Sequence, residues 1–332
     1  MSLKTVGVIG SGAWGTALAH IISTAGNDVT LWGRNSKTAN DINTKHENII
    51  YLKGLRLNSN IKATSKIEDV CKTDVIVLAV PAQQIRTITT NIQKLIASDV
   101  PIICSAKGFE LKTGMLMSEV FSETLSNNTI AVLSGPTFDN EINNGMPTAA
   151  TLAIKNQKTG EKLAKLFSSP IFRPYISSDI IGVQVGGAVK NIIAIACGIA
   201  LGQGFGENTR AAIVTRGLAE TTRLAVALGG TSETLSGLSG LGDFLLTCTS
   251  QQSRNFKFGR QLGEGCSPEF ILKNMEGVVE GWYSSAAVAK RAKDLEVDLP
   301  ICSSINSILS DNADINSTIQ NLLQRPIRKE LR

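Results

Sequence analysis

The sequence predicts two regions of different fold class: an α/β doubly wound domain over residues 1–180, followed by an all-α domain over residues 181–332. Three observations support this prediction. A strand, a glycine-rich turn and a helix follow one another near the start, apolar runs alternate with helical patterns to about residue 180, and strand signals vanish after Ser177. With 332 residues and 42% hydrophobic residues, the chain can form two sizeable cores.

The first elements form a strand–turn–helix–strand unit. Residues 6–9 are the short apolar run expected of a buried parallel strand, and residues 16–24 have an apolar face typical of a helix. Gly26 follows as a C-terminal cap, and residues 29–32 form the second strand.

Three glycines lie between the first strand and the helix in the order G-x-G-x-x-G. Gly10 allows the tight turn, Gly12 leaves room for a pyrophosphate beside the backbone, and Gly15 lets the helix pack closely on the strand. The helix N-terminus would then face the phosphates with free N–H groups. Such a motif alone is weak, but in this context it predicts a dinucleotide site of the Rossmann type.

The residue after the second strand bears on the choice of dinucleotide. NAD-binding domains usually carry an acidic residue there, which holds the ribose 2′-hydroxyl, but this chain has Gly33-Arg34-Asn35. Arg34 could pair with the 2′-phosphate of NADP, or it could be a solvated loop residue. We therefore favour NADP and leave NAD open.

Apolar runs and helical patterns alternate through the rest of the first domain, and residues 48–60 are expected to be a loop. The predicted strands are residues 61–64, 74–80, 101–105, 130–133, 148–154 and 172–176. The predicted helices are residues 36–45, a short one opened by a capping box at 65–68 and ending at Cys71, then 82–97, 115–125 and 160–167.

Long helical patterns follow at residues 180–201, 210–228, 268–275 and 284–293. Small residues lie in the first of these, and although glycine usually weakens a helix, here they would let another backbone pack closely. These small residues are Gly182, Gly186, Gly187 and Ala188.

The composition argues against several functional classes. The net charge of +5 is spread out, aromatic residues are few, and the one dense basic cluster is residues 325–332, which favours an anionic small molecule over a nucleic acid. With only His20 and His46, neither a zinc site nor a histidine-based triad is expected, and no metal is predicted.

The expected location is the cytoplasm. Six scattered cysteines without a C-x-x-C pair suggest reduced thiols, and the glycine turn lies too close to Met1 for a signal peptide. The longest apolar run, residues 192–201, is too short and too interrupted by glycine for stable membrane insertion. A homodimer is the common default for such a chain.

Two of the predicted strands end in residues able to bind an anionic ligand. Ligands of open α/β sheets bind at the carboxyl ends of the strands. Lys107 could offer a cation to a phosphate, and Thr137 a hydroxyl, although Lys107 could also be a surface lysine and Pro136 part of an ordinary turn.

Lys190 lies in a nearly all-apolar helix, where its ammonium must pair, reach solvent or lose its charge. Desolvation lowers a lysine pKa toward neutrality and makes the group a usable acid or base. Asn191 beside it could orient a substrate oxygen. The alternative is a structural lysine whose ammonium reaches solvent at an interface.

A second polar cluster lies within residues 237–259. Asp243 follows a glycine-rich turn, and Ser253, Arg254 and Asn255 offer a hydroxyl, a forked guanidinium and an amide. This could be a polar surface loop. Together with Lys190, however, it indicates a nicotinamide dehydrogenase with a lysine acid/base and an anionic, phosphorylated substrate.

Seven segments give the sequence a specific resemblance to bacterial NAD(P)-dependent glycerol-3-phosphate dehydrogenase. The resemblance implies reduction of dihydroxyacetone phosphate to sn-glycerol 3-phosphate, the glycerol backbone of phospholipids. The segments are GSGAWGTALA (10–19), LWGRN (31–35), SAKGFE (105–110), LSGPTF (133–138), AVKNIIAIACGIA (188–200), GLGDFLLTCTSQQSRNFKFG (240–259) and VVEG (278–281).

The resemblance also implies residue roles. Lys190 matches the proton donor and acceptor. The implied substrate contacts are Lys107, Gly135, Thr137, Lys190, Asp243, Ser253, Arg254 and Asn255. The implied cofactor contacts are Gly10, Ser11, Gly12, Ala13, Trp14, Gly15, Arg34, Lys107, Asp139, Arg254, Val278 and Glu280. Asp139 departs from the small residue expected there, which matters little if that contact is made by the backbone.

Two rival interpretations remain open. One is another member of the lysine-dependent hydroxyacid dehydrogenases, which share a lysine–asparagine pair on such a helix; Lys107 and residues 253–255 argue against it. The other is a sensor that binds NADPH without turnover, which would leave Lys190 unexplained.

Overall fold

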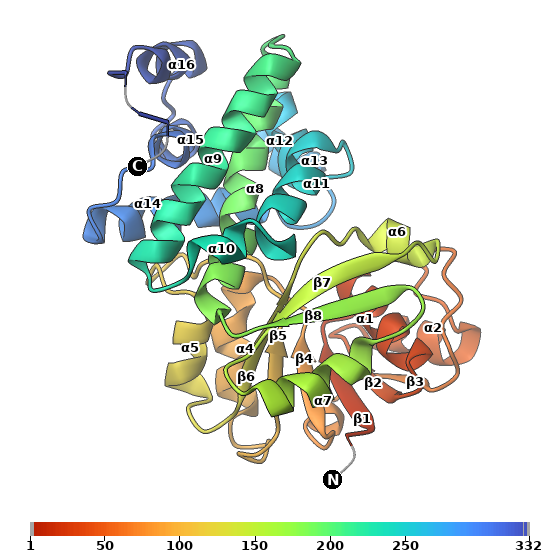
Figure 1. Ribbon diagram of the computed structural model, residues 1–332. Coiled ribbons are helices and arrows are strands. Elements are labelled where there is room, and N and C mark those ends of the chain that lie inside the picture. Colours follow the sequence, from red (N-terminus) through yellow and green to blue (C-terminus); the bar gives the residue numbers. More distant parts are fainter. Residues whose placement is uncertain (1–2, 328, 331–332) are drawn as a thin grey trace.

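The computed structural model describes residues 3–327 and 329–330 and has a sheet region followed by a helical region (Figure 1). Eight strands form one sheet in the order β3-β2-β1-β4-β5-β6-β7-β8. The strands are β1 (Thr5–Ile9), β2 (Asp28–Trp32), β3 (Ile61–Thr64), β4 (Val75–Leu78), β5 (Ile102–Cys104), β6 (Ile130–Ser134), β7 (Thr148–Ala153) and β8 (Phe172–Ser177). The predicted α/β fold class is thus confirmed.

Neighbouring strands are parallel except for β6 and β7, which pair antiparallel. From β1, the chain adds strands first on one side of the sheet, as β2 and β3, and then on the other side, beginning with β4. The β1 and β4 strands lie side by side with Ile9 opposite Leu78. In doubly wound sheets, a crevice for a ligand forms at such a switch point. The glycine turn lies at this point because it follows β1 directly.

Helices cover both faces of the sheet. One face packs against α1 and α7 through buried residues such as Leu18 and Phe167, and the other against α4 and α5 through Ile85 and Phe121. The helices of this region are α1 (Ala13–Thr24), α2 (Ser36–Lys45), α3 (Ile67–Val70), α4 (Ile85–Ile92), α5 (Met117–Thr124), α6 (Asp139–Asn143) and α7 (Gln157–Phe167), with a 3₁₀ helix η1 (Ala82–Gln84) before α4.

Several helix starts differ from the prediction, among them those of α1 and α3. The α1 helix begins at Ala13 and ends before Gly26, whose φ of +88° confirms the predicted glycine cap. The capping box was predicted wrongly, because α3 begins after Lys66 without a side-chain cap. Instead, the Thr64 hydroxyl accepts a hydrogen bond from the Lys66 N–H and donates one to Asp69.

The helical region is built around α8 (Figure 1, green). Its other helices are α9 (Glu207–Ala227), α10 (Ser232–Leu235), α11 (Asp243–Thr249), α12 (Arg254–Gly263), α13 (Pro268–Asn274), α14 (Glu280–Asp294), α15 (Pro300–Ser310) and α16 (Ile315–Leu323), with a π-helical turn η2 (Leu238–Gly242) before α11. Of these helices, α10, α11, α12, α15 and α16 were not predicted.

The α8 helix (Ile180–Gly202) is long and apolar enough to cross a membrane by length and composition, but 89% of its most apolar window is buried inside the fold. Its small residues explain this packing. A Cβ on Gly186 would lie 2.5 Å from the Ser239 carbonyl oxygen, as predicted, and one on Gly198 would overlap the Phe256 carbonyl oxygen of α12. The glycines of α8 therefore let neighbouring backbones approach it closely.

The basic cluster at residues 325–332 is described only in part. Arg325 pairs with Asp298 through a 2.7 Å contact. Arg328 and Arg332 lie outside the described residues.

Candidate active site

Residues 10–15, here called the cofactor turn, join β1 to α1 at the switch point of the sheet. A Cβ on Gly10 would overlap the Ala79 carbonyl oxygen, and one on Gly15 would overlap the Gly10 carbonyl oxygen. Gly12, by contrast, faces open space and begins α1 without a side-chain cap. The first N–H groups of α1 have no partner within the helix, so this end of α1 fits an anionic phosphate group.

The end of β2 lies against the cofactor turn. Gly33 has no room for a Cβ because it would overlap the Ser11 hydroxyl, and the exposed Arg34 follows directly. The indole N–H of Trp14 is buried without a hydrogen-bond partner among the described residues. An arginine and a free indole donor therefore flank the helix N-terminus.

Four side chains, here called the catalytic cluster after the role proposed for them below, meet where β5 ends against α8 and α11: Lys107, Lys190, Asp243 and Thr247. Asp243 is 1% exposed, and its two carboxylate oxygens accept hydrogen bonds from Lys107 Nζ at 2.8 Å and Lys190 Nζ at 2.7 Å. Lys190 Nζ also donates to Thr247 Oγ1 at 2.7 Å. With both lysines protonated the cluster carries one net positive charge, which suits an anionic substrate or a developing alkoxide.

The pKa of Lys190 is lowered from its usual value to about 8. Burial is the main cause, since the side chain is only 8% exposed; Asp243 opposes the shift and the nearby charge of Lys107 adds to it. The structure thus excludes a solvent-exposed ammonium. A lysine with this pKa can both donate and accept a proton near neutral pH.

A series of hydrogen bonds through two side-chain amides connects this cluster to the neighbouring elements. Asn191 Nδ2 donates to the Lys107 carbonyl oxygen at 3.2 Å, and Asn191 Oδ1 accepts from Asn255 Nδ2 at 2.9 Å. Asn255 Oδ1 in turn accepts from the Gly281 N–H at 2.9 Å. Asn191, expected to orient a substrate oxygen, therefore uses both ends of its amide within the protein and holds the end of β5 in place.

The predicted polar cluster at residues 253–255 begins α12 and is not a surface loop. The buried Ser253 caps the helix by accepting a hydrogen bond from the Phe256 N–H at 3.2 Å. Arg254 is exposed at the first helical position, and Gly277, with a φ of +81°, packs against its guanidinium. A guanidinium and a helix N-terminus thus lie together, a combination suited to a phosphate.

Glu280 begins α14 and faces the ends of the strands. Its Oε1 accepts a hydrogen bond from the Ala82 N–H at 3.2 Å, whereas its Oε2 is buried without a partner among the described residues. Burial raises the pKa of Glu280 to about 7, although the Ala82 N–H and the charge of Arg254 act against this shift. Val278 lies just before it and is half-buried.

The remaining predicted residues lie on the loop after β6. The Gly135 carbonyl oxygen accepts from Lys107 Nζ at 2.8 Å and from Thr137 Oγ1 at 3.2 Å. Asp139 begins α6, and its carboxylate accepts from the Asn140 N–H at 3.0 Å. The structure therefore joins Gly135 and Thr137 to the catalytic cluster, whereas it gives the Asp139 carboxylate a local partner.

Thr247 was missed at the sequence level. It lies four residues after Asp243, and this spacing places both side chains on one face of a helix. The sequence therefore contained the spacing that pairs Thr247 with Asp243, but this spacing has meaning only on a helix, and α11 was not predicted.

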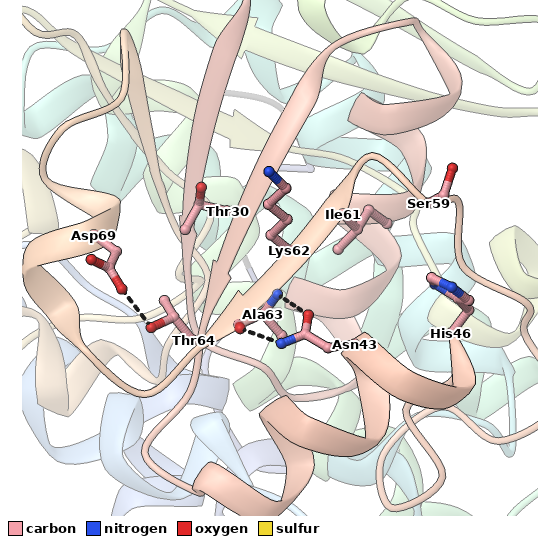
Figure 2. A pocket seen from close by; sticks show the side chains of 9 residues that line it. All are labelled: Thr30, Asn43, His46, Ser59, Ile61, Lys62, Ala63, Thr64 and Asp69. Carbon is pink, nitrogen blue, oxygen red and sulfur yellow. Dashed lines mark hydrogen bonds between the residues drawn. The ribbon is translucent and has the colours of Figure 1, made fainter.

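A hollow of about 530 Å³ lies elsewhere, along the edge strand β3 (Figure 2). Here the side-chain amide of Asn43 pairs with the backbone N–H and carbonyl of Ala63, both at 2.8 Å. Asn43 thereby satisfies part of an exposed sheet edge, a common protection against pairing with another chain. This hollow is separate from the strand ends where the predicted site residues gather.

Comparisons with known proteins agree over nearly the whole chain. Residues 5–160 match the family model "NAD-dependent glycerol-3-phosphate dehydrogenase N-terminus", and residues 179–320 match the corresponding C-terminus. Proteins from Rhodospirillum rubrum and Parvibaculum lavamentivorans, both named glycerol-3-phosphate dehydrogenase [NAD(P)+], are 45% and 42% identical. The alignments cover 98% of this chain and 93% of the first protein, and 99% of this chain and 99% of the second.

Solved structures give the same result. The crystal structure of glycerol-3-phosphate dehydrogenase from Coxiella burnetii matches with a TM-score of 0.93 and 34% identity, over 97% of this chain and 99% of that one. D-Mandelate dehydrogenase matches with a TM-score of 0.62 at 16% identity, over 96% of this chain and 99% of that one, which shows a shared fold only.

Proposed function

The chain belongs to the NAD-dependent glycerol-3-phosphate dehydrogenase family, and from this premise we propose how its own residues reduce dihydroxyacetone phosphate to sn-glycerol 3-phosphate. The enzyme is an oxidoreductase that uses NAD or NADP and acts on a CH–OH group. The observation that carries the proposal is Asp243 holding Lys107 and Lys190 in one buried cluster.

The cofactor binds across the switch point of the sheet. A bound nicotinamide dinucleotide supplies the hydride for reduction and accepts it in the reverse direction. The cofactor turn holds the pyrophosphate on its backbone N–H groups, with Trp14 beside it. Arg34 pairs with a 2′-phosphate, which favours NADP over NAD.

Residues at the start of α14 would also hold the cofactor. The unpartnered Oε2 of Glu280 supports a polar contact with the cofactor there, next to Val278 and Arg254. The Asp139 carboxylate has a local partner in the Asn140 N–H, so a cofactor contact of Asp139 would be made by its backbone.

Lys190 carries the proton. During reduction its ammonium donates a proton to the carbonyl oxygen of the substrate, and during oxidation its neutral amine accepts the proton back. A pKa of about 8 supports both roles. Asp243 and Thr247 hold Nζ in place, and Lys107 stabilises the negative charge that develops on the oxygen.

The phosphate of the substrate binds at the start of α12. Arg254 donates hydrogen bonds to two phosphate oxygens from its planar guanidinium, and Ser253 and Asn255 add further polar contacts. The other substrate contacts are Lys107, Gly135, Thr137, Lys190 and Asp243. The sheet region, residues 1–180, thus supplies most of the proposed cofactor contacts, and the helical region, residues 181–332, supplies most of the proposed substrate contacts.

The product supplies the glycerol backbone of phospholipids, and we place the enzyme in the cytoplasm. Six cysteines without paired spacing support a reducing compartment. We take a homodimer as the default assembly, because two-fold dimers are the commonest oligomers of soluble chains.

One assay separates this proposal from its rivals. Mixed with NADPH and dihydroxyacetone phosphate, the protein should lower the absorbance of the nicotinamide band. Turnover with a 2-keto acid but not with dihydroxyacetone phosphate would favour another lysine-dependent dehydrogenase. Binding of NADPH without turnover of either substrate would favour a sensor.

A further inference from the structure

Asn48 is fully buried and reaches the cofactor turn from the loop after α2. Its Nδ2 donates to the Ser11 carbonyl oxygen at 2.9 Å and to Thr16 Oγ1 at 2.8 Å. The Thr16 hydroxyl itself lies 3.5 Å from the same Ser11 oxygen. The side chain therefore connects the middle of the turn to the first turns of α1.

The orientation of the Asn48 amide follows from its partners. Its Oδ1 accepts a hydrogen bond from the Tyr51 N–H at 3.3 Å, so its NH₂ group must face Ser11 and Thr16. The loop is anchored on both sides, because the Leu57 N–H donates to the His46 carbonyl oxygen at 2.8 Å. Asn48 is thus a fixed group, held independently of the turn it contacts.

The Ser11 carbonyl and the Gly12 N–H belong to one planar peptide unit and point in opposite directions. By holding the carbonyl oxygen on one side, Asn48 directs the Gly12 N–H to the other. Gly12 leaves open space where a Cβ would stand, since nothing beyond its chain neighbours lies within 4 Å of that position. The Gly12 N–H donates to no acceptor among the described residues, so it is left for an anionic group.

We propose that Asn48 is a positioning residue for the cofactor turn: it fixes the Ser11–Gly12 peptide so that the Gly12 N–H is ready to bind the pyrophosphate. The inference rests on the proposed cofactor site. It assigns a binding role to a loop outside the glycine motif, and it does not depend on which dinucleotide is used, because NAD and NADP share the pyrophosphate.

Loss of the Asn48 amide should weaken the binding of NADPH and NADH equally. The bond at stake is the one from the Gly12 N–H to the charged pyrophosphate, and such a bond is worth about a 10-fold change in affinity or more. Asn48→Ala, which no longer fixes this N–H, should therefore raise Kd for NADPH and NADH about 10-fold each. Asn48→Asp has the same shape and keeps the acceptor for Tyr51, but it turns an oxygen toward the Ser11 carbonyl. Asn48→Asp should therefore weaken the binding of both cofactors more than Asn48→Ala does.

Asn128 provides a matched control. Its Nδ2 donates to the backbone carbonyls of Ala97 and Val100, both at 2.9 Å, before β5 and β6 begin and thus at the opposite edge of the sheet. Asn128→Ala also removes two hydrogen bonds donated by a side-chain amide, but it should leave both Kd values unchanged.

The experiment measures Kd for both cofactors by fluorescence titration without substrate, together with Tm, KM and kcat for the wild type and the three variants. We expect KM for the cofactor to rise with Kd in the Asn48 variants, while kcat at saturating cofactor stays within about 3-fold of wild type. Cofactor Kd values in Asn48→Asp equal to those of wild type, or a loss matched by Asn128→Ala at equal Tm, would overturn the inference. A wild-type protein that binds neither dinucleotide would instead overturn the proposed function.

Discussion

The cofactor turn and the catalytic cluster lie at the same edge of the sheet but are built in opposite ways. The turn presents backbone N–H groups at the start of α1 and depends on the absence of side chains at Gly10 and Gly15. The catalytic cluster brings together charged side chains from three elements in a buried place, with Asp243 between Lys107 and Lys190.

This difference determines how each site responds to substitution. A backbone site binds through geometry, so single side chains around it adjust affinity and selectivity by moderate factors. In the cluster, Asp243 compensates the charges of two lysines in a buried place. Removing one member upsets this balance of charge and, in the proposed mechanism, alters proton transfer directly.

The largest effect is expected in the cluster. Lys190→Met keeps the length and apolar stem of the side chain but removes the proton donor, and positioned proton transfer is worth about 100- to 10,000-fold. The kcat for reduction of dihydroxyacetone phosphate should fall by that factor while Kd for NADPH stays near wild type. A folded Lys190→Met variant with nearly normal kcat would contradict the assignment.

A smaller effect is expected at the start of α12. A hydrogen bond to a charged group contributes about 1.5–3 kcal/mol, so Arg254→Ala should lower kcat/KM for dihydroxyacetone phosphate about 10- to 150-fold. Arg254→Lys should restore only part of the loss, because a lysine cannot hold two oxygens with a planar fork.

Unphosphorylated dihydroxyacetone is the control for this prediction. It should be reduced about equally by wild type and by Arg254→Ala, measured at saturating NADPH because Arg254 also lies near the proposed cofactor site. Equal proportional losses with both substrates would mean that Arg254 does not bind the phosphate, and Lys107 would become the better candidate.

The smallest effect is expected beside the cofactor turn. Arg34→Asp replaces the proposed partner of the 2′-phosphate with a group that repels it, so kcat/KM for NADPH should fall about 10-fold or more. The value for NADH should change much less, since NADH has no 2′-phosphate. Equal losses with both cofactors would remove Arg34 from the proposed site.

The sheet region was largely predictable because its elements are set by local patterns. Apolar runs predicted every strand, and the glycine motif predicted the turn between β1 and α1. The antiparallel pairing of β6 with β7 was not predicted, because an apolar run carries no information about strand direction. The predicted helix at 82–97 also proved to be η1 followed by a shorter α4.

The helical region was less predictable because tertiary packing decides it. The α11 and α12 helices are short, with 7 and 10 residues, and packing on α8 stabilises them beyond their own propensity. Each charged residue of the cluster was found separately. Asp243, however, lies 53 residues from Lys190 and 136 from Lys107, so only the fold could show that it binds both.

The most direct test of the central claim, that Asp243 holds Lys190 as the proton donor, is the pH dependence of kcat in wild type and Asp243→Asn. Reduction needs the ammonium form, so kcat should fall as pH rises through about 8, and kcat for oxidation should rise over the same range. Asp243 raises the pKa of Lys190, so its neutralisation should move both limbs to lower pH. Limbs at the same pH in both proteins would contradict the account.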